Sequence, residues 1–372
     1  MKNNLLAIVF FLFSAGCSVQ AQPLEIYVSD AGNFSSFFQI LRFDENGENG
    51  EVFTNDQLAW PQDIVYLQHR NSIIVSNLNS GKITEYNADT GQYIGDFATG
   101  IGGPTRMKIG ADGLLYVLQW QGDEKVLRYD LDGNLVDRFT DVGVSNSIGL
   151  DWDSAGNLYV SSYDGRYVQQ FSSTGESMGR FINSNLSGPT NIWFDDEGNL
   201  FVADWTGGSV KKFDAYGNYL GIFISGVGQV EGVDFLTDGT LLVGDGQGSS
   251  VNRYDSGGNF IEEFVPSGTL GLRQPNAVVI RELGISPVRE TPKPVAFIAP
   301  SAGVEFNLLN GNTAPGIEAF EIYDVLGRLQ ASMPYTGKTV VWNAETFAEG
   351  IYLIVARLKD GTAWSQKAVV KK

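Results

Sequence analysis

The stretch that decides the fold is residues 189–214, PTNIWFDDEGNLFVADWTGGSVKKFD. Ile192 and Phe194 alternate with polar residues, as in a strand with one buried face. The Asp-Asp-Glu-Gly-Asn segment at 195–199 suits a tight reversal, because Gly and Asn tolerate a positive φ. The stretch therefore predicts three short antiparallel strands, and a turn at 215–218 leads to a fourth strand at 219–223.

The same unit recurs along the chain. In five places a valine closes a short apolar strand, and successive valines are 41 to 43 residues apart. These valines are Val75, Val117, Val160, Val202 and Val243. A period of about 40–50 residues with several strands per unit is typical of a β-propeller, in which each repeat forms one blade.

The two ends of the repeat region are incomplete in a complementary way. Residues 25–53 supply only the last three strands of a unit, and the missing first strand occurs at 275–280. Pairing these two ends in one sheet would remove an exposed edge and close the ring. Five whole units and this composite unit predict an all-β fold with a six-bladed β-propeller.

The units resemble NHL repeats. The matching pattern is Pro-x-x-apolar, then Asp-x-x-Gly-Asn-Leu-Tyr/Phe-Val, then apolar-x-x-Phe/Tyr-Asp; residues 189–214 fit it best and 147–171 fit closely. The resemblance covers about 25–281 and implies the propeller fold. It implies no single function, because NHL propellers include enzymes, scaffolds and binding modules.

The composition changes after Ile280, where four prolines between 287 and 300 mark a linker. The remaining residues predict a small β-sandwich, with strands near 317–323, 328–332, 339–342, 351–357 and 364–370. This region resembles the C-terminal sorting domain of type IX secretion cargo. The matching segments are 322–328 (IYDVLGR), 347–352 (FAEGIY) and the basic end 367–372. The resemblance implies that the type IX secretion machinery is a partner; the alternative is an immunoglobulin-like accessory domain.

The N-terminus is typical of a secretory signal, with Lys2 before an apolar run at 5–15 that is too short to span a bilayer. Residues 19–21 (VQA) suit a signal-peptidase site and predict cleavage after Ala21. The alternative is a lipoprotein whose lipid is attached to Cys17. The predicted domains are the signal peptide (1–21), the propeller (22–283), a Pro-rich linker (284–300) and the sorting domain (301–372). The predicted location is secreted, either extracellular or attached to the outer-membrane surface.

The charge and hydropathy patterns exclude two classes of partner. The formal net charge of −18 argues against nucleic acid, whose binders neutralise phosphates with Lys and Arg. It also argues against binding to anionic membrane surfaces. After the leader, no stretch of the sequence is long and apolar enough to predict a transmembrane helix.

A propeller brings the start of each first strand and the end of each second strand to one mouth of its channel. The candidate ligand-binding residues at this mouth are Asp63, Arg106, Trp120, Tyr163, Asn191, Asp204, Trp205, Glu231 and Asp245. Trp120 and Trp205 share one repeat position and could form a stacking surface for a sugar or another flat ligand. The polar residues could instead order water in the channel. We therefore expect a module that binds an extracellular glycan, peptide or protein without a cofactor.

An enzymatic function is the alternative. The only histidine of the sequence is His69, expected in a turn away from this mouth, so a multi-His zinc site is excluded. A metal-dependent lactonase or other hydrolase of the regucalcin-like class would need Glu231, Asn191 and Asp204 to hold Ca²⁺ or another divalent cation. Arg106 decides between the two hypotheses: a salt bridge to Glu231 or Asp63 across the channel favours binding, and an Arg106 turned away favours the hydrolase.

Overall fold

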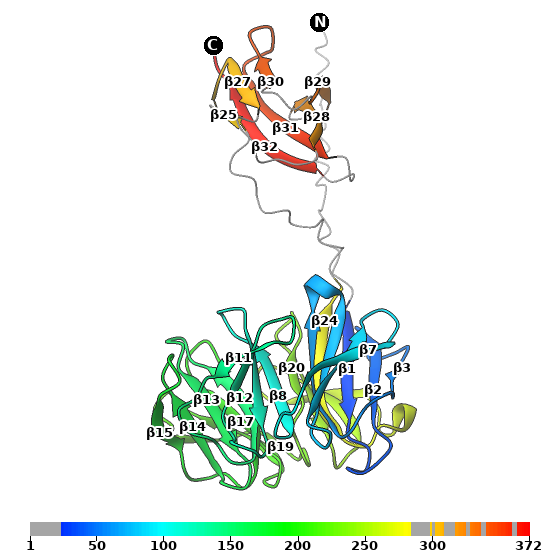
Figure 1. The fold of residues 1–372 in the computed structure, drawn as a ribbon, viewed down its shortest axis with the longest axis vertical. Coiled ribbons are helices and arrows are strands. Elements are labelled where there is room, and N and C mark those ends of the chain that lie inside the picture. The colour runs from blue at the N-terminus through cyan, green and yellow to red at the C-terminus, as the bar shows by residue number, and fades with distance from the viewer. Residues whose placement is uncertain are drawn as a thin grey trace, which may run out of the picture. The chain divides into compact units, whose positions relative to one another are not determined.

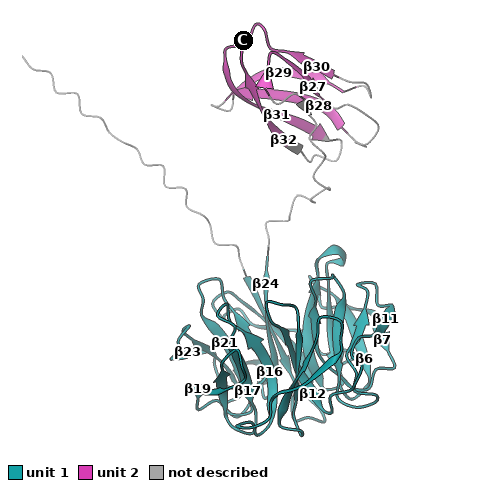
Figure 2. Ribbon diagram, turned by 90° about the vertical axis from the view of Figure 1, so that its left-hand side faces the viewer, with its two compact units in different colours: residues 1–283 teal, residues 284–372 magenta. Residues whose placement is uncertain are grey.

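The structure is a computed structural model that describes residues 24–283, 298–299, 302–308, 317–324, 328–335, 340–358 and 363–372. The chain divides into two compact units, residues 1–283 and 284–372, which Figure 2 distinguishes by colour. The predictions for Cys17 and Ala21, and almost all of the Pro-rich linker, lie outside the described residues.

In its described part, unit 1 contains six four-stranded antiparallel sheets (Figure 1). The first sheet consists of β24 (Pro275–Glu282), β1 (Leu24–Asp30), β2 (Gln39–Asp44) and β3 (Glu51–Thr54). The second consists of β4 (Pro61–Leu67), β5 (Ser72–Asn77), β6 (Lys82–Asn87) and β7 (Tyr93–Thr99). The third consists of β8 (Pro104–Ile109), β9 (Leu115–Gln119), β10 (Leu127–Tyr129) and β11 (Leu135–Arg138).

The other three sheets of unit 1 follow the same order. The fourth consists of β12 (Ser147–Trp152), β13 (Leu158–Ser162), β14 (Tyr167–Phe171) and β15 (Ser177–Ile182). The fifth consists of β16 (Pro189–Phe194), β17 (Leu200–Asp204), β18 (Ser209–Phe213) and β19 (Tyr219–Ser225). The sixth consists of β20 (Val233–Phe235), β21 (Leu241–Asp245), β22 (Ser250–Tyr254) and β23 (Phe260–Val265). Two short 3-10 helices, η1 (Gln68–Arg70) and η2 (Thr269–Gly271), lie in loops.

The first sheet joins the two ends of the repeat region. Strand β24 pairs antiparallel with β1, in a register that sets Ile26 opposite Ile280 and Val28 opposite Val278. Both strands are largely buried, and β1 is covered on its other edge by β2. The prediction that 275–280 supplies the missing first strand is confirmed.

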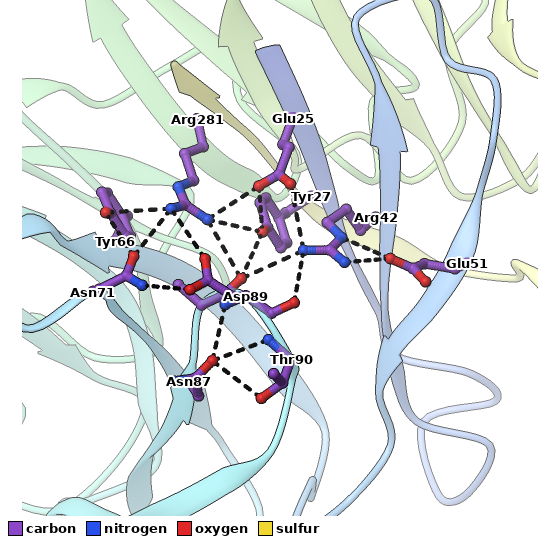
Figure 3. A network of polar contacts seen from close by, with 11 residues as sticks. Glu25, Tyr27, Arg42, Glu51, Tyr66, Asn71, Asn87, Asp89, Thr90 and Arg281 are labelled. Carbon is purple, nitrogen blue, oxygen red and sulfur yellow. Dashed lines mark hydrogen bonds and ion pairs between the residues drawn. The ribbon is translucent and has the colours of Figure 1, made fainter. Parts of the chain in front are cut away.

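A polar network reinforces this junction (Figure 3). Arg281 of β24 donates to Glu25 of β1 at 3.1 Å, and its other terminal nitrogen donates to Tyr66 of β4 at 3.3 Å and to Asn71, in the loop between β4 and β5, at 3.2 Å. Tyr27 of β1 donates to Glu25 at 2.7 Å. The side chain of one residue near the end of unit 1 therefore ties the first sheet to the second.

The Asp-Gly-Asn turns have a common internal structure. In the turn at 195–199, Asp195 Oδ1 accepts the Asn199 backbone N–H at 2.7 Å, and Asn199 Nδ2 donates to Asp195 Oδ2 at 2.8 Å. Gly198 has a φ of +82°, which favours glycine. The same bonds form at Asp130, Asp214 and Asp255. The repeated turn sequence thus fixes where each hairpin reverses.

Apolar cores lie between neighbouring sheets, and carboxylates connect the sheets through backbone N–H groups. Asp63 of β4 accepts from the backbone of Met107 in β8 at 2.8 Å. Asp151 of β12 accepts from β16 at 2.9 Å, and Asp234 of β20 accepts from β24 at 2.7 Å. One of the apolar cores contains Val28, Leu41, Leu242, Val251, Val265 and Val278 of the sixth and first sheets. Hydrophobic burial and directional bonds together fix the sheets relative to one another.

Unit 2 contains two sheets in its described part. One consists of β25 (Ile298–Ala299), β27 (Glu305–Leu308) and β30 (Val340–Asn343). The other consists of β26 (Ala302–Gly303), β32 (Ala363–Val370), β31 (Gly350–Leu358), β28 (Ile317–Asp324) and β29 (Leu329–Pro334). Phe306 and Trp342 of the first sheet share a core with Phe320 and Ile354 of the second. The five strands expected from the sequence are present with ends shifted by at most two residues.

Candidate functional site

A cavity of about 340 Å³ lies in unit 1 where the first strands of the sheets begin. Its lining combines aromatic and aliphatic side chains with a few polar ones. The lining residues are Phe34, Trp60, Gln62, Leu78, Trp120, Ile148, Tyr163, Thr190, Trp205, Gln229, Glu231 and Asn276. A concave, mostly apolar site with convergent polar groups is the usual form of a small-molecule site.

Five aromatic residues form what we call the aromatic collar: Phe34, Trp60, Trp120, Tyr163 and Trp205. All five are half-buried, so part of each ring remains accessible. The ring of Phe34 lies 5.1 Å from that of Trp60 and 6.2 Å from that of Trp205, and the rings of Trp120 and Tyr163 are 5.9 Å apart. The collar is thus a set of tilted ring surfaces contributed by several different sheets.

The repeat backbone positions three members of the collar in the same way. Each follows directly after the second strand of its sheet, and its N–H donates to the residue before the first strand. The bonds run from Trp120 to Gly103 at 2.8 Å, from Tyr163 to Asn146 at 3.0 Å and from Trp205 to Gly188 at 2.9 Å. Leu78 occupies the same position in the second sheet, and its N–H donates to Trp60 at 3.1 Å. In the sixth and first sheets this position is small, Gly246 and Ala31.

Two collar residues have a backbone conformation that bulky side chains rarely adopt. Phe34 has a φ of 66° and Trp60 a φ of 56°. At the position equivalent to Trp60, the third sheet has Gly103 and the fourth has Asn146. Glycine and asparagine tolerate a positive φ better than tryptophan does. Such residues cost on the order of 1–3 kcal/mol and concentrate at functional sites. The placement of aromatic rings here therefore opposes backbone preference.

Below the collar, buried polar side chains form what we call the polar floor: Gln62, Thr190, Glu231 and Asn276. Gln62, Thr190 and Asn276 are the second residues of β4, β16 and β24, so the repeat brings these three to one level, and Glu231 lies in the segment just before β20. In the amide orientation that satisfies its neighbours, Gln62 accepts from Trp60 Nε1 and Asn276 Nδ2, both at 2.7 Å. Its nitrogen then donates to Glu231 at 3.3 Å. The floor is connected to the collar by hydrogen bonds.

An ion-pair cluster lies directly beneath the floor. Arg106 donates to Asp63 at 3.0 Å and to Glu231 at 3.3 Å, and all three side chains are almost fully buried. Both salt bridges that the sequence left as alternatives are therefore present, and Arg106 is not turned away. Asp63 and Arg106 also line a second cavity of about 240 Å³, whose other lining includes residues near the ends of the first strands.

Glu231 has a strongly shifted titration. Burial raises the pKa of Glu231 to about 8; Arg106 opposes this rise and Asp63 adds to it. Burial is the largest of these effects and outweighs the opposing pull of the Arg106 guanidinium. Below this pKa the floor therefore presents a neutral carboxylic acid beside a matched Arg106–Asp63 pair.

The structure divides the sequence-predicted site residues into three groups. Trp120, Tyr163, Trp205 and Glu231 line the 340 Å³ cavity. Asp63, Arg106 and Asn191 line the 240 Å³ cavity. Asp204 and Asp245 line neither of these cavities.

The last two carboxylates instead bond to the backbone of their own sheets. Asp204 accepts from the Gly188 N–H at 2.6 Å and forms a salt bridge with Lys211 at 2.5 Å. Asp245 accepts from the N–H groups of Gly228 and Gly248 at 3.1 and 2.9 Å. The expectation that strand-end polar residues converge on the mouth does not hold for these two, because their oxygens are engaged in loop backbone.

The cavity also contains residues that the sequence-based set of site residues omits. Leu78 could have been found, because it shares the repeat position of Trp120 and Trp205. Phe34 lies in the loop after β1 and corresponds to no repeat position, so no sequence signal marked it. Gln229, which like Trp60 has a positive φ (54°), lies in the loop that leads to β20.

The residues proposed for a metal are not gathered at one place. Glu231 lines the larger cavity and Asn191 the smaller, whereas Asp204 is paired with Lys211. In the part of the chain that the structure describes, no three His, Cys, Asp or Glu side chains are grouped in a way that could hold a metal ion. Nor does any helix within the described ranges reach the length and apolarity needed to cross a membrane.

Comparisons with known proteins support the fold. No family matches the sequence, and no curated protein matches it. A solved nidogen–laminin complex contains a chain with a TM-score of 0.57 at 14% identity, covering 69% of this chain and 98% of that one. A protein of unknown function from Bacteroides caccae has a TM-score of 0.55 at 14% identity, with the same coverage. These likenesses show that the chain contains a β-propeller.

Proposed function

We propose that this protein is a binding module whose ligand occupies the 340 Å³ cavity. The observation that carries the proposal is the aromatic collar above a buried polar floor. Half-exposed tryptophans supply stacking surface, and the buried amide and carboxyl groups supply orientation. Two collar residues adopt a strained backbone, which is expected where ring placement matters more than local stability. A peptide or protein that inserts one side chain is the alternative occupant.

The metal-dependent lactonase has less support. Its three oxygen ligands would have to surround one ion, yet Asp204 is bound to Lys211 and to the backbone of its own sheet. Arg106 bridges Glu231 and Asp63. Its positively charged guanidinium would repel a divalent metal ion bound beside these carboxyl groups. The salt bridge was the feature that separated the two hypotheses, and it favours binding.

We further propose that unit 1 is a closed six-bladed propeller of the NHL type, and that the chain is exported by type IX secretion. The six sheets and the β24–β1 pairing support closure. The apolar leader, the IYDVLGR and FAEGIY segments and the basic end support export to the cell exterior or its surface, with unit 2 as a β-sandwich sorting domain. To test the export proposal, the protein is expressed with and without residues 301–372 in a host that has type IX secretion. Cell fractionation then shows whether the protein reaches the cell surface or the medium only when these residues are present.

Replacement of the collar tryptophans Trp120 and Trp205 should weaken binding strongly. We expect glycan and peptide arrays to retain the wild-type protein, and the Trp120→Ala/Trp205→Ala variant to lose at least tenfold in affinity, about 1.4 kcal/mol. Tyr216→Ala is the matched control, because Tyr216 is an aromatic residue 86% exposed on a turn outside the cavity. Undiminished binding by the folded double variant would exclude the collar as the binding site.

A further inference from the structure

One buried acceptor in the floor lacks a partner. Asn276 is 1% exposed and lines the cavity, and its Oδ1 accepts no hydrogen bond. Its Nδ2 is directed to Gln62 at 2.7 Å, so the amide cannot turn without breaking that bond. Buried polar groups are nearly always paired, so this oxygen needs a donor from water or from a ligand in the cavity, and a ligand that displaces the water must replace that donor. The ligand should therefore carry an O–H or N–H group.

The charges beneath the floor are already matched. Arg106 is 8% exposed and contacts both Asp63 and Glu231; because burial raises the pKa of Glu231 to about 8, at lower pH Arg106 and Asp63 form one matched ion pair beside a neutral acid. Among the lining residues of the cavity there is no lysine, arginine or histidine to receive an anion. Burial of an ionised group without a new partner is costly, so a charged ligand would have to disrupt this cluster.

The aromatic collar alone does not select a ligand class. Tryptophan faces attract ammonium groups as well as the C–H faces of sugar rings. A quaternary ammonium, however, has no donor for Asn276, and a protonated amine at the floor would approach the Arg106 guanidinium below it. The volume of about 340 Å³ is near the lower end of the range for small-molecule sites, about 300–1,000 Å³, and favours one or two rings.

We infer that the cavity binds an uncharged, hydroxyl-bearing ring with the chemistry of a neutral sugar residue. The ring stacks in the aromatic collar, and one hydroxyl donates to Asn276 Oδ1. This inference rests on the proposed binding function and specifies the ligand class for the same cavity. It excludes uronic acids, amino sugars and quaternary ammonium compounds as the preferred ligands.

The test uses residues 22–372 and sugars that share one ring configuration but differ in charge at one substituent. Three series are based on glucose, galactose and mannose, each with the neutral hexose, its uronate and its 2-amino sugar; choline is added as a quaternary ammonium. Binding is measured at pH 7 and millimolar concentration by ligand-observed NMR. In at least one series the neutral sugar should bind about tenfold more tightly than both charged relatives, and Trp205→Ala should abolish its signal.

A floor variant tests the hydrogen bond itself. Asn276→Leu has the same branching but removes both the Oδ1 acceptor and the Nδ2 donor to Gln62, and should weaken binding of the neutral sugar about tenfold. For a deoxy sugar that lacks the donating hydroxyl, Asn276→Leu should cause a smaller loss of affinity. If Asn276→Leu does not fold, the charge series on the wild-type chain still decides the inference.

Three outcomes would overturn the inference. Tighter binding of a uronate, an amino sugar or choline, with loss of signal in Trp205→Ala, would mean that the cavity binds a different ligand class and that the proposed function stands. If no neutral sugar binds, neutral sugars are rejected as the ligand class. The array experiment with the collar variant then decides separately whether the cavity binds any ligand. If both Trp205→Ala and Asn276→Leu bind a neutral sugar as tightly as the wild-type protein does, the sugar binds outside this cavity.

Discussion

A chain that ends at Gln274, and so lacks β24, is expected to lose the cooperative unfolding transition of unit 1. Removal of β24 exposes the edge of β1 and opens the core that Val278 shares with Val28 and Leu242. It also deletes Arg281, which ties the first sheet to the second. Each fully buried aliphatic side chain contributes about 1.5–3 kcal/mol, and a domain is stable by only about 5–15 kcal/mol.

The control is a chain that ends at Leu283, which retains β24 and removes unit 2. Thermal unfolding followed by near-ultraviolet circular dichroism should show one sharp transition for this control and a broad or absent one for the shorter chain. A sharp transition at the same midpoint in both chains would contradict the role assigned to the β24–β1 pairing.

Replacement of Arg106 with methionine should destabilise unit 1 by about 3–5 kcal/mol at pH 8, since it leaves the buried Asp63 carboxylate without its cation and removes the guanidinium that lowers the pKa of the buried Glu231. The loss should be smaller below pH 8, because Glu231 is then protonated in the wild-type protein and no longer needs Arg106 as a counter-charge. Denaturant unfolding at several pH values measures it. Addition of Asp63→Asn and Glu231→Gln to Arg106→Met should restore much of the stability, and a cost independent of pH and of these additions would indicate a packing effect instead.

The wild-type protein should show a related pH dependence. Burial raises the pKa of Glu231 to about 8 from an ordinary value of 4.5, so between these values the folded state holds a proton that the unfolded state releases. The free energy of unfolding therefore decreases as the pH rises through this interval. Glu231→Gln should reduce this slope. An unchanged slope would mean that Glu231 does not titrate in this way.

The repeat made the fold predictable. The regular valine spacing and the Asp-Gly-Asn turns gave the strand order of each sheet, and the incomplete unit at 25–53 indicated that β24 pairs with β1. The strands of unit 2 were also anticipated closely. Periodicity succeeds here because alternation of buried side chains and turn geometry are both local properties of the chain.

The site was less predictable, for two physical reasons. The position of a residue in the repeat predicts its level in the structure but not the partner of its side chain. Asp204 was expected at the mouth, yet it forms a salt bridge with Lys211 and accepts a hydrogen bond from loop backbone. Phe34 reaches the cavity from an irregular loop, where no period applies. By contrast, Trp120 and Trp205 were identified because their position repeats and their residue type is uncommon there.

The central claim is that ligand binds within the aromatic collar, and ¹⁹F NMR of the protein carrying fluorotryptophan tests it most directly. Of the seven tryptophans, Trp60, Trp120 and Trp205 line the cavity, whereas Trp152, Trp193 and Trp342 do not. Assigned by single replacements with phenylalanine, the three cavity signals should shift on titration with the neutral sugars or array ligands, while those of Trp152, Trp193 and Trp342 stay fixed. Binding that leaves the three cavity signals unmoved, or that shifts Trp193 or Trp342 instead, would contradict the account.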